Sequence, residues 1–161
     1  MASTYSWSSA SGLVSSRRTA LRAKASARSR VRSGKLNLKA LDDPGKVYTY
    51  HDPCYLGRAN QEYAAPRQVL DGLGCQTAEM TRNKSFALCC GAGGGQMFKE
   101  AEQGEKEVFI ERTEDALNTG ADIIATACPY CIANFEDSRL ALKDDASLEI
   151  KDITEIVAEA L

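Results

Sequence analysis

The sequence has no apolar run of the roughly 20 residues that a helix needs to cross a bilayer, and it has no signal peptide with an apolar middle segment. These absences favour a chain that is soluble on its own and disfavour a secreted disulfide scaffold. The G-x-G-x-x-G and phosphate-loop patterns are also missing, which argues against a nucleotide site. With 161 residues, the chain fits one domain of ordinary size.

Acidic residues are absent from the first 41 positions, which hold nine Lys or Arg, while the remainder holds eleven bases and 22 acids. Residues 1–40 are rich in Arg and Ser and cannot bury enough apolar surface to fold, so we expect a disordered leader. Three interpretations compete: an organelle transit peptide, a nucleic-acid arm, and a non-native leader from a truncated or mis-framed reading. No nucleic-acid partner is expected, because the rest of the chain is acidic and no base-reading motif accompanies the arm.

Residues 41–161 alternate between strand-like and helix-like patterns. The β-branched and aromatic run at 47–50 and the short apolar run at 121–127 are typical of strands, and helical spacing of apolar residues marks the segments between them. Expected strands are 47–50, 77–80, 121–127 and 148–151, and expected helices are 66–73, 105–118, a segment from 129 onward, and 154–161. This alternation predicts an α/β fold with a mostly parallel sheet.

Five of the six cysteines fall into three groups that follow expected strands. They are Cys54, then after 34 residues the pair Cys89-Cys90, then after 37 residues Cys128 and Cys131 in a C-x-x-C unit. Ligands of open α/β sheets bind beyond the carboxyl ends of the strands, so the fold predicts one metal site at that edge. The glycine-dense segment after Cys90 lets the backbone approach a ligand closely.

Donor count favours an iron-sulfur cluster over a single ion. Structural zinc takes four tetrahedral ligands, and five cysteines exceed that number. The side chains of the adjacent Cys89 and Cys90 point apart, so they bind different irons of a cluster more easily than one ion. Zinc, disulfides and free thiols stay as alternatives. We interpret Cys75, which lies outside the pattern, as an incidental thiol.

Other residues admit a functional and a structural interpretation. The sole histidine, His51, either binds a metal or transfers protons near a substrate, or it has a structural role in ordering its loop. Arg58 and Arg67 either stabilise an anionic cluster or are solvated helix charges. The C-P-Y-C unit ending at Cys131 is identical to a glutaredoxin motif, but only about thirty residues follow it here, whereas most of a thioredoxin-like domain follows its motif.

Three stretches in order resemble the cysteine-rich CCG domain that occurs in heterodisulfide reductases and in the iron-sulfur subunits of glycolate, lactate and glycerol-3-phosphate oxidoreductases. They are residues 51–58 (HDPCYLGR), 89–95 (CCGAGGG) and 127–131 (ACPYC), and the resemblance covers roughly residues 33–161. It implies a noncubane [4Fe-4S] cluster held by Cys54, Cys89, Cys90, Cys128 and Cys131.

The resemblance also implies a function. We expect an iron-sulfur oxidoreductase subunit that transfers single electrons to a disulfide, quinone or similar acceptor; the alternative is a non-catalytic docking module stabilised by zinc or a cluster. Implied partners are a flavin-containing dehydrogenase subunit or ferredoxin-like domains, with membrane contact only through them. A cytoplasmic location is expected, or an organelle if residues 1–40 are a transit peptide.

Members of this family generally carry two such domains plus ferredoxin-type cysteine runs. The present sequence has one domain and no ferredoxin run. We therefore expect a C-terminal fragment of a longer enzyme, with residues 41–161 as its cysteine-rich domain.

Overall fold

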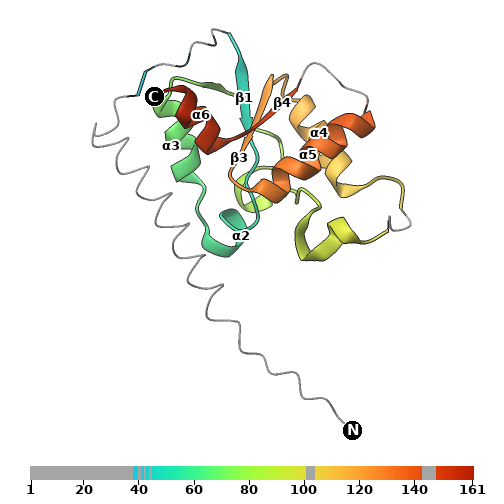
Figure 1. The fold of residues 1–161 in the computed structure, drawn as a ribbon. Helices are drawn as coiled ribbons and strands as arrows, with labels where there is room; N and C mark the ends of the chain where they lie inside the picture. The colour runs from blue at the N-terminus through green and yellow to red at the C-terminus, as the bar shows by residue number, and fades with distance from the viewer. Residues whose placement is uncertain (1–37, 40, 42, 44, 101–103, 143–147) are drawn as a thin grey trace. The chain divides into compact units, whose positions relative to one another are not determined.

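The computed structural model contains one parallel sheet, and it describes residues 38–39, 41, 43, 45–100, 104–142 and 148–161. Within this part of the chain, all strand pairings are parallel and the strand order is β2-β1-β3-β4 (Figure 1). The strands are β1 (Val47–Tyr50), β2 (Gln76–Thr77), β3 (Ile123–Thr126) and β4 (Glu149–Asp152). The predicted α/β fold with a mostly parallel sheet is confirmed.

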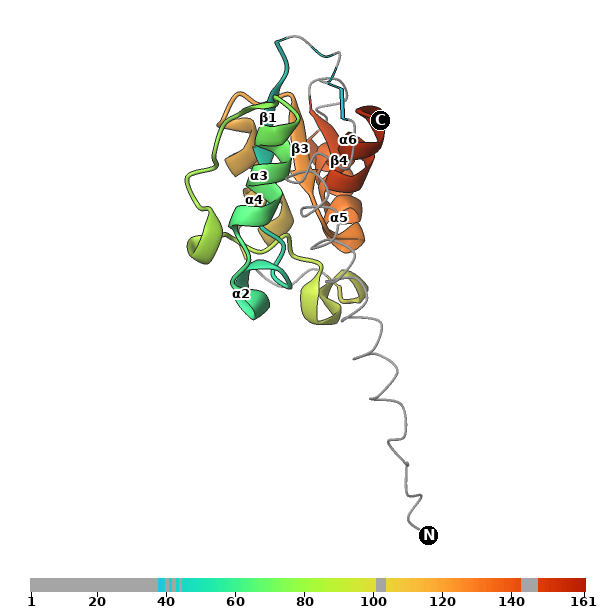
Figure 2. The ribbon, with the colours of Figure 1, turned by 90° about the vertical axis from the view of Figure 1, so that its left-hand side faces the viewer.

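Helical segments connect these strands. They are α2 (Gly57–Asn60), α3 (Ala64–Gly72), the 3-10 segments η1 (Lys84–Phe86) and η2 (Gly93–Phe98), α4 (Val108–Leu117), α5 (Pro129–Leu142) and α6 (Ile153–Glu159). Helices α3 and α6 cover one face of the sheet, and α4 and α5 cover the other (Figures 1 and 2). Among the described residues, no helix combines the length and apolar character needed to cross a bilayer.

The central strands are buried because both faces of the sheet are covered. All four residues of β3 are buried, as are the last three of β1. A hydrophobic cluster beneath α4 and α5 includes two of the cysteines; its buried members are Met80, Cys90, Ala92, Ala116, Ile124, Cys131, Phe135 and Leu148. These cysteines are therefore part of the core as well as of the predicted site.

The structure differs from the sequence predictions mainly in short elements. The second strand was expected at 77–80 but is Gln76–Thr77, an exposed edge strand without an apolar pattern. The helix expected at 105–118 begins at Val108, and α2 and η2 were not predicted. Segment η2 owes its shape to Gly94 and Gly95, whose φ angles of 66° and 78° lie outside the helical region.

Candidate metal centre

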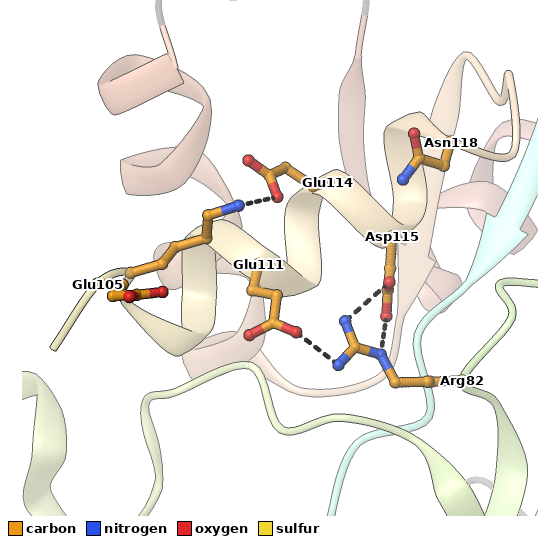
Figure 3. A pocket seen from close by; sticks show the side chains of 7 residues that line it. Arg82, Glu105, Glu111, Glu114, Asp115 and Asn118 are labelled. Atoms are coloured by element: carbon orange, nitrogen blue, oxygen red, sulfur yellow. Dashed lines mark hydrogen bonds and ion pairs between the residues drawn. The ribbon is translucent and has the colours of Figure 1, made fainter.

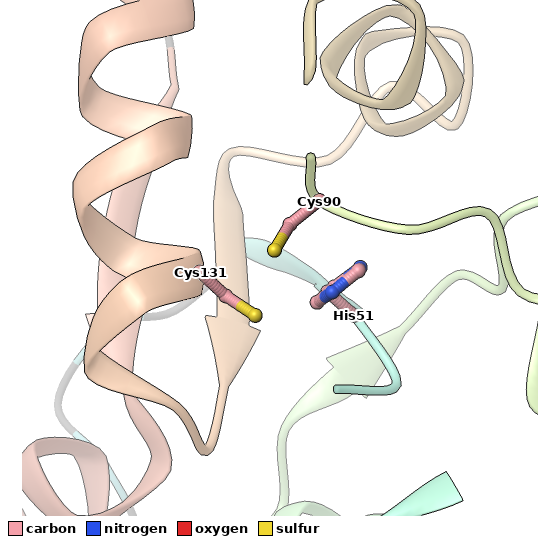
Figure 4. A group of neighbouring side chains, drawn as sticks. All are labelled: His51, Cys90 and Cys131. Carbon is pink, nitrogen blue, oxygen red and sulfur yellow. The ribbon is translucent and has the colours of Figure 1, made fainter. Parts of the chain in front are cut away.

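The candidate centre lies at the carboxyl edge of the sheet, where three chain segments converge. His51 follows β1, Cys90 comes from the loop between η1 and η2, and Cys131 lies in the first turn of α5. Their ligand atoms all lie within 4.8 Å of one another, and all three residues are buried (Figure 4). Cys90 reaches this edge through the long segment after β2, which includes η1, rather than directly at a strand end.

Cysteine sulfurs crowd around Cys90. Hydrogen bonds from Cys131 and Cys89 lower the pKa of the Cys90 thiol. The pKa of Cys131 is raised because its thiol interacts with Cys128 and Cys90. A thiolate at Cys90 beside a thiol at Cys131 is thus favoured, because a second negative charge next to it in this buried space would need a cation.

Cys128 is placed to ionise at the start of α5. A hydrogen bond from Cys131 lowers the pKa of Cys128 to about 6, and the backbone amides of Cys131 and Tyr130 act in the same direction. These amides belong to the first turn of a 14-residue helix, where the N–H groups and the helix dipole favour anions.

Cys54 and Cys75 occupy different positions. Cys54 is exposed in the loop after β1. The pKa of Cys89 is raised first by its hydrogen bond to Cys90 and then by burial. Cys54 therefore lies on the outer side of the cysteine group. Cys75 precedes β2 at the amino end of a parallel strand, which is the opposite edge of the sheet. Burial raises the pKa of Cys75 to about 11.

The turn after Cys90 depends on a glycine. Gly91 has a φ of +89°, and its N–H donates to the Cys89 sulfur at 3.4 Å. The side-chain amide of Asn134 donates to the Cys90 carbonyl at 2.9 Å. A Cβ atom at position 91 would meet Asn134 and Phe109 atoms at 3.3 Å. The backbone of the cysteine pair thus fits closely between α4 and α5.

We predict that Gly91→Ala lowers the free energy of unfolding by about 2 kcal/mol, because a side chain at this φ is strained and its neighbours are close. Denaturant unfolding of the full chain measures the change, and iron content should fall with it. Gly93→Ala is the matched control: Gly93 has no positive φ, and a Cβ there would meet nothing within 4 Å. Equal effects of the two substitutions would contradict the role of Gly91.

His51 is a core residue. Its side chain is 1% exposed, and its ring makes an edge contact with Phe135 at a centroid distance of 5.0 Å. Its Nδ1 accepts a hydrogen bond from the Nε of Arg112 at 3.0 Å. Burial lowers the pKa of His51, which favours the neutral ring. The histidine thus packs structurally and also faces the cysteine group.

Arg112 is a site residue that the sequence analysis missed. It is fully buried in α4 and donates to the carbonyl of Arg82 at 2.6 Å and to Asp115 at 3.2 Å. The acid-rich sequence around it is typical of a solvated helix face. The position of Arg112 was informative, since it lies four residues before Ala116, a buried residue on the same side of the helix.

Arg58 and Arg67, the two arginines that the sequence singled out, stabilise loops near the site. Arg67 pairs with Asp52 at 2.8 Å and with Glu79 at 2.5 Å. Arg58 donates to the carbonyl of Ala87, two residues before Cys89. Neither arginine is needed to explain the charge of the cysteine group.

An acidic hollow lies on the outer side of α4 (Figure 3). Its lining residues are Arg82, Glu105, Lys106, Glu111, Glu114, Asp115 and Asn118. Arg82 pairs with Glu111 and Asp115, and Lys106 pairs with Glu114. These pairs neutralise much of the charge in the hollow. Asp115 also contacts Arg112, so the hollow adjoins the buried arginine.

The donor set fits a soft metal centre. It consists of thiol sulfurs from separate segments, with the His51 imidazole beside them, and apolar side chains of the core enclose it. Sulfur donors of this kind suit zinc and iron-sulfur clusters. The thiolates that the lowered pKa values of Cys90 and Cys128 favour supply the negative charge that a cationic group would stabilise.

Comparison with known proteins identifies relatives across the same segment. Residues 48–136 match the family model described as "Cysteine-rich domain" (CCG). The chain is 46% identical over 121 residues to one subunit of the dihydromethanophenazine:CoB--CoM heterodisulfide reductase of Methanosarcina barkeri, covering 72% of this chain and 28% of that protein. It is 38% identical over 117 residues to the probable iron-sulfur-binding oxidoreductase FadF of Bacillus subtilis, covering 72% and 16%.

A third relative is the EtfAB:quinone oxidoreductase of Syntrophomonas wolfei, 36% identical over 130 residues, which cover 77% of this chain and 18% of that protein. The chain therefore spans less than a third of the length of these relatives. The family model covers more than half of the chain and includes all five cysteines of the predicted pattern. The chain belongs to the CCG cysteine-rich domain family.

Proposed function

We propose that this chain holds a noncubane [4Fe-4S] cluster through Cys54, Cys89, Cys90, Cys128 and Cys131. The observation that supports this most strongly is the crowding of sulfurs around buried Cys90 at the carboxyl edge of the sheet. A polynuclear cluster can accept more thiolates than a single zinc ion. The name of the relative FadF, an iron-sulfur-binding oxidoreductase, agrees with this choice.

The chain's residues would have distinct tasks in such a site. When bound, the cluster supplies single-electron transfer. Cys90 and Cys131 would hold it from the hydrophobic core, which excludes water. Cys128 meets it at the start of α5, where amides stabilise the thiolate. Cys54 would hold it from an exposed loop, which a redox partner would be able to reach.

The function that fits this site is that of an iron-sulfur oxidoreductase subunit that passes electrons singly to a disulfide, quinone or similar acceptor. Named relatives include a heterodisulfide reductase subunit and a quinone oxidoreductase. Proposed partners are a flavin-containing dehydrogenase subunit or ferredoxin-like domains, and membrane contact would come through them. A cytoplasmic location is part of the proposal.

We also assign residues 41–161 to the cysteine-rich domain and residues 1–40 to a leader. The leader falls almost wholly outside the described residues. Near the boundary between the two, the backbone N–H of Lys39 donates to the carbonyl of Ala160 at 2.8 Å. Lys39 therefore already contacts the cysteine-rich domain, which supports a start of that domain before residue 41.

The alternative function is a non-catalytic docking module stabilised by zinc or a cluster. Exposed aromatic side chains near the cysteine segments favour this alternative. Phe86 is 84% exposed, Phe98 is 85% exposed, and Tyr130 between the last two cysteines is 60% exposed. Large exposed rings of this kind are common in protein interfaces.

Metal analysis of the full chain, purified without oxygen, tests the proposal. We expect about four irons and a similar amount of acid-labile sulfide per chain, a brown colour, and a paramagnetic signal in one oxidation state. Colourless protein with stoichiometric zinc would refute the cluster. A cluster that neither accepts nor donates electrons would support the docking module instead.

A further inference from the structure

We infer that His51 is a hydrogen-bond donor to the sulfur of the metal centre and not a metal ligand, and that Arg112 is the positioning residue that fixes this role. This inference rests on the proposed function, because the hydrogen-bond acceptor is a sulfur of the proposed cluster site. The His51–Arg112 contact itself does not depend on the identity of this acceptor.

The protonation pattern of the ring follows from its contact with Arg112. A guanidinium has only N–H donors and no acceptor. Because the Nε–H of Arg112 points at Nδ1 of His51 at 3.0 Å, Nδ1 must offer its lone pair. The proton of the neutral ring is then on Nε2. A protonated Nε2 has no free lone pair, so neither ring nitrogen is available to a metal.

The Nε2–H group makes no hydrogen bond of normal geometry to a described residue, and the nearby Cys90 sulfur, whose hydrogen bonding opposes the lowering of the His51 pKa by burial, is the acceptor within reach. His51 is 1% exposed, so water cannot replace a protein acceptor for Nε2. One ring nitrogen lies within 4.8 Å of the sulfurs of both Cys90 and Cys131 (Figure 4). A buried donor without a partner is costly, so a sulfur brought slightly closer in the loaded site would satisfy it.

Arg112 is held firmly enough to impose this arrangement. Its Nη1 donates to the Arg82 carbonyl and to Asp115, and its side chain is fully buried. Asp115 in turn accepts a bidentate pair from Arg82 at 2.8 and 2.9 Å (Figure 3). On its other side, the His51 ring rests against Phe135. The ring thus has little freedom to exchange Nδ1 for Nε2.

A hydrogen bond from His51 to sulfur would favour the reduced centre, because reduction adds negative charge to the sulfur. Removing the donor should therefore make the reduction potential more negative without removing iron. His51→Phe deletes the donor, and His51→Gln keeps an N–H near the place of Nε2. We expect full iron content in both variants, a more negative potential in the Phe variant, and partial recovery in the Gln variant.

Selective labelling gives a direct structural test, since the chain has a single histidine. In the full-length chain without metal, ¹⁵N-histidine spectra should show a proton on Nε2 and none on Nδ1. Arg112→Met should release this preference and Arg112→Lys should restore part of it. In the iron-loaded chain, the label should show weak hyperfine coupling, because no iron–nitrogen bond exists.

The inference would be overturned by a proton on Nδ1, by strong nitrogen coupling to iron, or by a loss of iron in His51→Phe as large as in a cysteine variant. An unchanged potential in His51→Phe would also refute it. A chain that binds no iron would instead refute the proposed function. The histidine spectra of the metal-free chain would still test the contact with Arg112 in that case.

Discussion

Replacing Cys90 with serine is expected to abolish most of the iron binding, whereas replacing Cys75 with serine should leave it intact. Cys90 is 4% exposed, and the pKa of its thiol is lowered by the hydrogen bonds from Cys131 and Cys89. A serine hydroxyl stays protonated near neutral pH and is a poor ligand for soft metals. Loss of a group that only hydrogen-bonds to a ligand already costs roughly 10–100-fold in metal affinity, so loss of a central ligand should cost more.

Iron and sulfide content per chain, measured after anaerobic purification, checks this prediction. Cys75→Ser is the control, because it makes the same substitution at a partly buried thiol that lies at the opposite edge of the sheet. Far-ultraviolet circular dichroism separates loss of a ligand from loss of the fold. Equal iron loss in both variants, with the fold retained, would refute the assignment of the five-cysteine set.

The main strands and helices could be predicted because their sequence patterns are strong. The continuous apolar run at Ile123 and Ile124 indicated a strand buried on both faces, and β3 is one. The strand β2 was misplaced because Gln76 and Thr77 are polar and exposed, so hydrophobic periodicity does not mark them. The segment η2 was missed because glycines with positive φ carry no apolar pattern.

The cysteine group could be anticipated because parallel strands bring their carboxyl ends to one edge. Its surroundings could not be read from sequence in the same way. Arg112 is charged and stands among acids, so composition suggests a solvated residue, yet tertiary packing buries it completely. Its buried hydrogen-bond partner, His51, is 61 residues away in the chain. Contacts of that range depend on the assembled fold rather than on local pattern.

Arg67→Met is expected to lower the free energy of unfolding by about 3 kcal/mol, because it leaves a buried carboxylate without its partner. Arg67 makes two hydrogen bonds to Asp52, at 2.8 and 2.9 Å, and the Asp52 side chain is only 1% exposed. The guanidinium also lies over the Tyr50 ring, 5.3 Å from its centroid. Asp52 accepts the backbone N–H of Lys84 at 2.7 Å, so the ion pair joins the loop after β1 to α3 and η1.

Denaturant unfolding of full chains with equal iron content measures the loss. Lys46→Met is the control: Lys46 and its partner Glu149 have side chains 39% and 49% exposed, so its removal should cost less than about 1 kcal/mol. Adding Asp52→Asn to Arg67→Met should recover part of the stability, because the unpaired charge is removed while the Asn oxygen can still accept from Lys84. If the double variant is no more stable than Arg67→Met, the buried charge is not the cause, and lost packing of Arg67 on Tyr50 would explain the change instead.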